Sequence, residues 1–127
     1  MTSPETKPVV LCIDDESSIL ASLGRQLSRE FEFRSVQVSG TEDLAKIREA
    51  ITALPENAVV VSDLRMSGVD GREVIKEVHR AGHKVLTLSG TTDDLKKAPE
   101  QPDDVMTKPW EMEVLRARLR NLLGQGQ

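Results

Sequence analysis

Hydrophobic and polar positions alternate along this chain in two patterns. Short apolar runs, such as Val9–Ile13 and Ala58–Ser62, are followed by segments with an apolar residue every three or four positions. The runs predict buried strands, and the segments predict helices with one face toward a core. The short links between them imply right-handed crossovers and a parallel sheet covered on both faces. We expect strands over Val9–Asp14, Phe31–Ser39, Ala58–Asp63, Lys84–Ser89 and Asp103–Thr107, and helices over Ser17–Glu30, Thr41–Ile51, Gly71–Ala81 and Glu111–Leu123.

Several residues set the expected ends and faces of these helices. Thr41 is placed as an N-cap, and Asp70 and Glu73 have the spacing of a capping box. Gly82 follows the third helix as a C′ residue. The last helix is expected to turn four apolar residues inward: Val114, Leu115, Leu119 and Leu122.

The interval between the fourth and fifth strands breaks the alternation. Only Thr92–Lys97 has a helical pattern there, because Pro99 and Pro102 remove backbone donors and disfavour helix in the residues before them. We therefore expect a shortened or irregular fourth helix of at most about two turns.

Length, charge and cysteine content narrow the class of protein. The 127 residues fit one domain, with a core over about residues 8–123 and frayed termini. The net charge of −4 gives no support to nucleic-acid or membrane binding. The single cysteine, Cys12, excludes an internal disulfide and is expected to be a small apolar residue of a central strand. The polar start, Met1–Pro4, carries no signal-peptide core, so we expect a cytoplasmic protein.

Four of the predicted strands end in residues suited to phosphoryl chemistry. Asp14 and Asp15 end the first, Asp63 the third, Ser89 the fourth, and Lys108 follows the fifth. Parallel strands place these ends on one edge of the sheet, where open α/β folds bind ligands. Carboxylates packed closely repel one another unless a cation lies between them, and an all-oxygen set suits Mg²⁺.

These motifs occur in the order found in response-regulator receiver domains, the phosphoacceptor modules of two-component signalling, and the chain resembles that family over nearly its whole length. The matching segments are Cys12–Glu16, Val61–Met66, Gly68–Gly71, Leu88–Gly90 and Lys108–Trp110. The resemblance implies an α/β, flavodoxin-like, doubly wound sheet of five parallel strands in the order 2-1-3-4-5.

The resemblance also implies a role for each residue of the site. Asp63 would accept a phosphoryl group from a histidine kinase or phosphotransfer protein. Asp15, Asp63 and the main-chain carbonyl of Arg65 would ligate Mg²⁺, and Asp14 would assist through water. Lys108 and Ser89 would bind phosphoryl oxygens, and the Lys108–Pro109 peptide is expected to be cis.

The sequence departs from the family at a few positions. Val105 stands where receivers usually carry an aromatic residue, which puts the usual hydroxyl–aromatic coupling in doubt. We hypothesise that segment 90–103 is mobile and becomes ordered when phosphate on Asp63 draws in Ser89; the alternative is a stably folded loop without a switching role. Ser67 replaces the usual proline and is expected to leave its loop freer.

Other residues receive plainer interpretations. Arg65 and Thr91 flank the expected path of attacking water, although Arg65 is equally well a solvated cation. His79 and His83 lack metal-ligand spacing and are interpreted as surface residues. Trp110 is expected to pack against the domain.

The sequence therefore predicts a stand-alone, Mg²⁺-dependent receiver that relays a signal through protein contacts to a protein target that the sequence does not identify. It is not an enzyme beyond phosphorylating and slowly dephosphorylating itself, and it has no nucleic-acid or membrane partner; a homodimer stays open. One alternative is a pseudo-receiver that binds partners without being phosphorylated. Another is a phosphohydrolase of the haloacid-dehalogenase type, which we discount because Arg65 stands where its second aspartate is needed.

Overall fold

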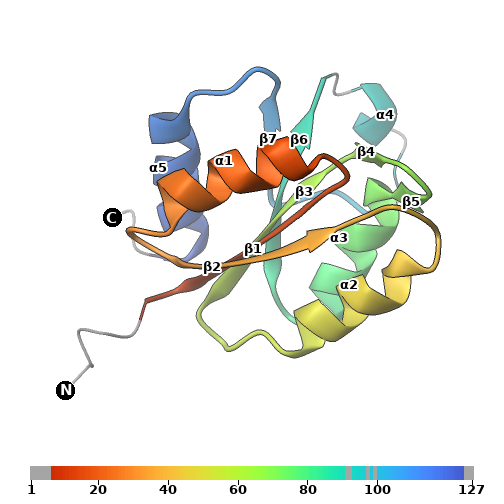
Figure 1. Cartoon of the computed structure of the whole chain (residues 1–127), viewed down its shortest axis with the longest axis horizontal. Helices are drawn as coiled ribbons and strands as arrows, with labels where there is room; N and C mark the ends of the chain where they lie inside the picture. The colour runs from red at the N-terminus through yellow and green to blue at the C-terminus, as the bar shows by residue number, and fades with distance from the viewer. Residues whose placement is uncertain (1–6, 91–92, 97, 99, 125–127) are drawn as a thin grey trace.

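The computed structural model describes residues 7–90, 93–96, 98 and 100–124. Five parallel strands form one sheet in the order β2-β1-β3-β6-β7, which is the predicted 2-1-3-4-5 order (Figure 1). The elements are β1 (Val9–Asp14), α1 (Ser17–Leu27), β2 (Glu32–Gln37), α2 (Asp43–Thr52), β3 (Ala58–Asp63), β4 (Arg65–Met66), β5 (Val69–Asp70), α3 (Gly71–Arg80), β6 (Lys84–Ser89), α4 (Asp93–Lys96), β7 (Asp104–Thr107) and α5 (Met112–Leu122).

The central strands follow directly from the apolar runs. β1 and β3 are buried at every position, as strands covered on both faces must be. The observed bounds of β1, β3 and β6 are the predicted ones. Cys12 is buried in β1, as expected, and burial raises the pKa of its thiol.

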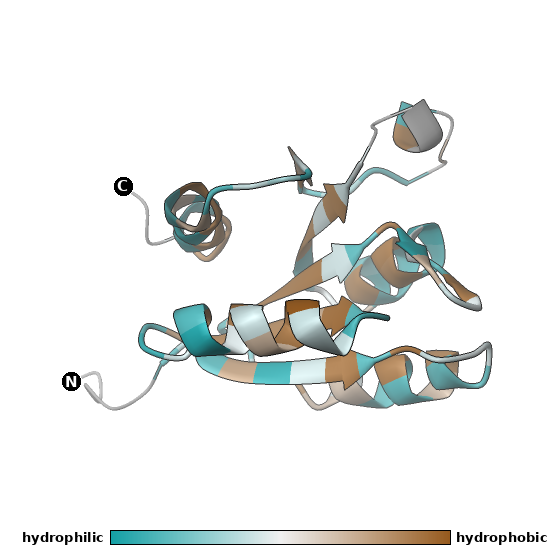
Figure 2. Ribbon diagram, turned by 45° about the horizontal axis from the view of Figure 1, so that its top comes forward, coloured by the Kyte–Doolittle hydropathy of each residue, from teal (hydrophilic) through white to brown (hydrophobic). Residues whose placement is uncertain are grey.

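Two apolar layers lie on opposite faces of the sheet. One joins the odd-numbered residues of β1 to α2 and α3, and the other joins its even-numbered residues to α1 and α5. Figure 1 shows α1 and α5 on one side of the sheet and α2 and α3 on the other, and Figure 2 shows the hydrophobic strands between them. Trp110 packs against the second layer, as predicted.

The start of α2 differs from the prediction at Thr41. The helix begins at Asp43, whose buried carboxylate accepts hydrogen bonds from the backbone N–H groups of Ser39 (2.6 Å) and Gly40 (3.2 Å). These bonds lower the pKa of Asp43 to about 2. The side chain that binds these N–H groups therefore belongs to the first residue of the helix and not to the N-cap position before it.

The ends of α3 agree with the sequence pattern. The Asp70 carboxylate accepts a hydrogen bond from the Arg72 N–H at the helix start. At the other end Gly82 has a φ of 84°, a left-handed conformation that glycine adopts without a Cβ clash. The His83 N–H donates to the Val78 carbonyl, which completes a Schellman-type C-cap.

Two helices depart from the apolar pattern. α1 ends at Leu27 rather than Glu30, since the polar residues 28–30 form a turn before Phe31 enters the core. In α5 Leu115 and Leu119 are fully buried, but Val114 is 39% exposed, so its predicted inward position is wrong. A single stripe of α5 meets the sheet, and Val114 lies one residue outside it.

The fourth helix is as short as the prolines predicted. α4 is a four-residue turn, and its Leu95 is buried in the core. Thr91, Thr92 and Lys97 lie outside the described residues, as does part of segment 90–103, whose ordering on phosphorylation stays a prediction. None of the helices in the described part of the chain is long and apolar enough to cross a membrane.

Candidate functional site

Three carboxylates meet at the carboxyl edge of the sheet. Asp14 ends β1, Asp63 ends β3, and Asp15 follows Asp14 directly. One carboxylate oxygen from each lies within 4.8 Å of the other two. The sheet order makes β1 and β3 neighbours, which is why residues 48 positions apart (63 − 15) come together.

Asp14 is almost fully buried in this cluster. Desolvation, together with the nearby charge of Asp63, raises its pKa to about 6. The N–H of Glu16 donates to Asp14 Oδ1 at 2.9 Å, which fixes the orientation of the carboxyl group. A buried acid beside two more acids is a costly arrangement unless a cation or proton offsets the charge.

Asp15 is held from outside the cluster. Ser67 donates both its backbone N–H and its hydroxyl to Asp15 Oδ2, each at 3.1 Å. Although partial burial acts to raise it, these hydrogen bonds keep the pKa of Asp15 below its ordinary value. The Asp15 carboxylate is thus ionised and oriented. The loop at Ser67 gains two contacts rather than the freedom expected from the loss of proline.

Lys108 supplies the positive charge of the site. Its Nζ donates to Asp63 Oδ2 at 2.9 Å, and its side chain is 30% exposed against 7% for Asp63. The Lys108–Pro109 peptide is cis, as the resemblance implied. The ammonium is therefore anchored beside Asp63 yet open to solvent on one side.

The remaining predicted residues also lie at this edge. Ser89 is buried at the end of β6, and its carbonyl accepts the Lys108 N–H at 2.8 Å. Arg65 is exposed in β4, two residues after Asp63. The strand-end rule has brought the five predicted residue positions to one region of the sheet edge.

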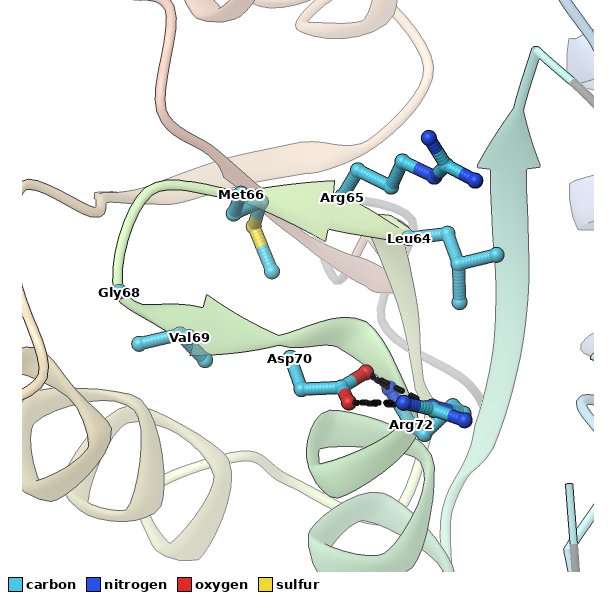
Figure 3. Close-up of a pocket in the computed structure, with 7 residues that line it drawn as sticks. All are labelled: Leu64, Arg65, Met66, Gly68, Val69, Asp70 and Arg72. Atoms are coloured by element: carbon cyan, nitrogen blue, oxygen red, sulfur yellow. Dashed lines mark hydrogen bonds and ion pairs between the residues drawn. The ribbon is translucent and has the colours of Figure 1, made fainter. Parts of the chain in front are cut away.

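A short antiparallel hairpin follows Asp63 and was absent from the sequence prediction. β4 and β5 pair Arg65 with Asp70 and Met66 with Val69, where a plain loop was expected. The hairpin lines a surface hollow of about 500 Å³. Figure 3 shows its lining residues, with Arg72 against Asp70. The hollow is lined by the hairpin and excludes the three acids, so its volume does not mark the site of chemistry.

The donor set fits a hard divalent cation. All three acids offer oxygen ligands, and the cluster of described acidic residues contains neither histidine nor cysteine. Carboxylate oxygens are the ligands that Mg²⁺ prefers, usually with several waters retained. Burial raises the pKa of Asp14, and a bound cation would favour its ionised form.

Sequence reasoning missed two side chains. Ser67 was noted only as a missing proline, because its partner is 52 residues away. The interpretation of His79 as a surface residue missed its partners: the side chain is 27% exposed, with Nδ1 at 2.8 Å from Glu100 and Nε2 at 2.8 Å from Asp103. No local spacing indicates that contact, since both acids lie beyond the next strand.

Known proteins are similar to this chain in sequence and in fold. Residues 10–120 match the family described as the response regulator receiver domain. The transcriptional regulatory protein AfsQ1 of Streptomyces coelicolor is 29% identical over 94% of this chain and 53% of its own length. The transcriptional regulatory protein PrrA of Mycobacterium tuberculosis is 32% identical over 97% of this chain and 53% of its own length.

The chain thus spans about half the length of these curated relatives. Among solved structures, the receiver domain of sensor histidine kinase PA1611 from Pseudomonas aeruginosa has a TM-score of 0.73 at 16% identity, over 94% of this chain and 99% of that one. That structure has a magnesium ion coordinated in its active-site cleft. At this identity it supports the fold of the present chain.

Proposed function

The chain belongs to the family of response regulator receiver domains, and from that premise we propose that Asp63 accepts a phosphoryl group in a Mg²⁺-dependent reaction. The donor is the phosphohistidine of a sensor kinase or phosphotransfer protein, and the signal passes on through protein contacts. Residues 1–127 act as one receiver domain with its core over about 8–123. The prediction that this receiver stands alone stays open, because the relatives named above are about twice as long as this chain.

One observation carries the proposal. Asp63 lies within reach of two further carboxylates and of a lysine ammonium at 2.9 Å, at the end of a central strand. A solvated cluster of acids would not need a buried Asp14 or a lysine placed directly after β7. Three carboxylates that can hold a cation, together with a lysine ammonium, would stabilise a negatively charged phosphoryl group as it approaches the Asp63 carboxylate.

The residues divide the reaction between them. An Asp63 oxygen attacks the phosphorus, a P–O bond forms as the P–N bond breaks, and the electron pair leaves with the histidine nitrogen. Lys108 moves from Asp63 to a phosphoryl oxygen, and the Ser89 hydroxyl donates to another. Mg²⁺ held by Asp15, Asp63 and the Arg65 carbonyl, with Asp14 assisting, would offset the charge repulsion.

The partners follow from the family and the relatives. A histidine kinase or phosphotransfer protein is the donor proposed for this receiver. The named relatives are transcriptional regulators, so the expectation of no nucleic-acid partner has no support from them. The net charge of −4 argues only against nucleic-acid binding by these 127 residues themselves.

Intact-mass measurement with acetyl phosphate and Mg²⁺ tests the proposal. We expect one added phosphoryl group, lost in Asp63→Asn and in EDTA, and retained in the matched control Asp70→Asn. Asparagine is as good an N-cap as aspartate, so this control leaves α3 intact. Absence of the adduct in the wild-type protein, with a control receiver labelled alongside and beryllofluoride binding also absent, would favour the pseudo-receiver.

A further inference from the structure

The contact between Ser67 and Asp15 joins two loops that are far apart in the sequence. Both donors of Ser67, the N–H and the hydroxyl, converge on Oδ2 of Asp15 at 3.1 Å. Proline at this position would remove the N–H and the hydroxyl together. The contact is therefore a property of this chain's serine.

The hairpin holds Ser67 in place from the other side. Ser67 lies in the turn between β4 and β5, next to Gly68. Gly68 has a φ of 79°, and a Cβ there would lie 2.8 Å from the Gly40 carbonyl carbon and the Thr41 nitrogen. Figure 3 shows Gly68 at the tip of the hairpin, with Val69 beside it. The turn is thus packed against the β2–α2 loop, while Val69 is buried in the core.

Fixed donors have a specific effect on a carboxylate. An ionised carboxylate offers about four lone-pair positions, of which Ser67 uses two on one oxygen. The other positions stay available to a cation, and the side chain no longer rotates freely. Partners of this kind typically contribute about 10- to 100-fold to metal affinity.

Asp14 and Asp15 depend on different supports. Asp14 is oriented by the N–H of Glu16, two residues later in the chain. Asp15 contacts Asp14 and its own backbone, and it receives two further hydrogen bonds from across the site, from Ser67 in the hairpin. A shift of the hairpin therefore changes the support of Asp15 and leaves the Glu16 bond of Asp14 in place.

We propose that Ser67 is a positioning residue that orients Asp15 for the divalent cation and thereby couples the β4–β5 hairpin to cation binding. The proposal rests on the proposed function, since it concerns the Mg²⁺ site of the phosphoacceptor. Coupling of this kind is reciprocal, so a bound cation should also stabilise the hairpin turn.

Calorimetric titration with MgCl₂ tests this role without any phosphoryl transfer. Ser67→Ala keeps the N–H and should weaken Mg²⁺ binding about 3- to 10-fold, and Ser67→Pro should weaken it about 10- to 100-fold. Ser67→Thr keeps both donors and should restore binding to within about twofold. Ser35→Ala, at an exposed position of β2, is the matched control and should bind as the wild type does.

Slower exchange of the Ser67 amide in saturating MgCl₂ is the second readout. A serine that merely stabilised the turn would change the unfolding midpoint and leave the Mg²⁺ affinity unchanged. Equal affinities for the wild type, Ser67→Ala and Ser67→Pro would overturn the positioning role. Absence of Mg²⁺ binding in the wild type would overturn the metal site itself, and Ser67-dependent binding without phosphorylation would overturn the proposed function alone.

Discussion

Substitution of His79 by glutamine should destabilise the protein in a pH-dependent way. The imidazole lies between Glu100 and Asp103, with 2.8 Å contacts at both ring nitrogens. Ionised carboxylates accept hydrogen bonds and do not donate them, so both nitrogens donate only when the ring is protonated. His79 therefore joins α3 to the connection between α4 and β7 as a cation.

The magnitude follows from the burial of the three side chains. Hydrogen bonds to charged groups contribute about 1.5–3 kcal/mol when buried, and exposed ion pairs about 0.2–1 kcal/mol. The side chains of His79, Glu100 and Asp103 are 27%, 43% and 29% exposed, which places the pair of contacts between these limits. Asp103 keeps its hydrogen bond from the Val85 N–H after the substitution. We expect a loss of about 1–1.5 kcal/mol and a fall in Tm of about 3–6 °C.

The sign of the pH dependence is fixed by the direction of the shift. Although partial burial acts to lower it, the contacts with Asp103 and Glu100 raise the pKa of His79 above its ordinary 6.5. The stabilisation is complete below pH 6.5 and is lost as the pH rises through the higher folded pKa. Lys76 and Glu73 line the same hollow as Glu100.

Urea unfolding of the wild type and His79→Gln from pH 5.5 to 9 measures the effect. The difference between the two free energies of unfolding should be largest at pH 5.5–6 and should shrink at alkaline pH. His83→Gln, a second half-buried histidine, is the matched control and should show no such trend. A difference that stays constant across the range would refute the cationic bridge.

Three further predictions concern the site and its supports. MgCl₂ at ten times its Kd should raise the free energy of unfolding by about 1.4 kcal/mol, and EDTA should reverse the rise in Tm; an unchanged Tm would contradict cation binding to the folded state. Gly71→Ala should cost about 1–3 kcal/mol in urea unfolding, because its Cβ would lie 2.6 Å from the Leu64 backbone. Gly90→Ala should be neutral, because no atom of the described residues other than its chain neighbours lies within 4 Å of the added Cβ. Beryllofluoride should increase amide protection across residues 90–103 as Ser89 is drawn in, and unchanged exchange there would favour the stably folded loop.

The sheet was predictable because its strands are buried on both faces. β1, β3 and β6 consist mostly of apolar residues, and the polar residue that ends each strand marks the edge of the sheet. The same rule predicted that Asp14, Asp63 and Lys108 would meet. The strands and the acidic cluster could thus be predicted from local patterns, which a single sequence contains.

The features that were missed depend on contacts between distant segments. The β4–β5 hairpin has two residues on each side, too few to show a period of two. The partner of Ser67 is 52 residues away, and His79 bonds to acids 21 and 24 residues later. Val114 has the right chemistry for a core position, but the line of contact along α5 is set by the sheet.

A ligand shifts a conformational equilibrium only through groups that it contacts differently in the two states. In the reaction proposed above these groups are Lys108 and Ser89, and the Lys108 N–H donates to the Ser89 carbonyl at 2.8 Å. Val105 carries no ring whose burial could change, and its half-buried side chain packs against the layer that contains Leu95.

The other link from β6 to the region around α4 runs through side chains. Asp103 accepts from the Val85 N–H and contacts His79, so the residues after α4 are tied to both β6 and α3. The Val85 N–H lies near the start of β6, so this link holds the α4–β7 connection at the edge of the sheet opposite Ser89. Where receivers usually carry an aromatic ring, this chain has Val105, and the charged contact between His79 and Asp103 makes the attachment of the α4–β7 connection depend on pH.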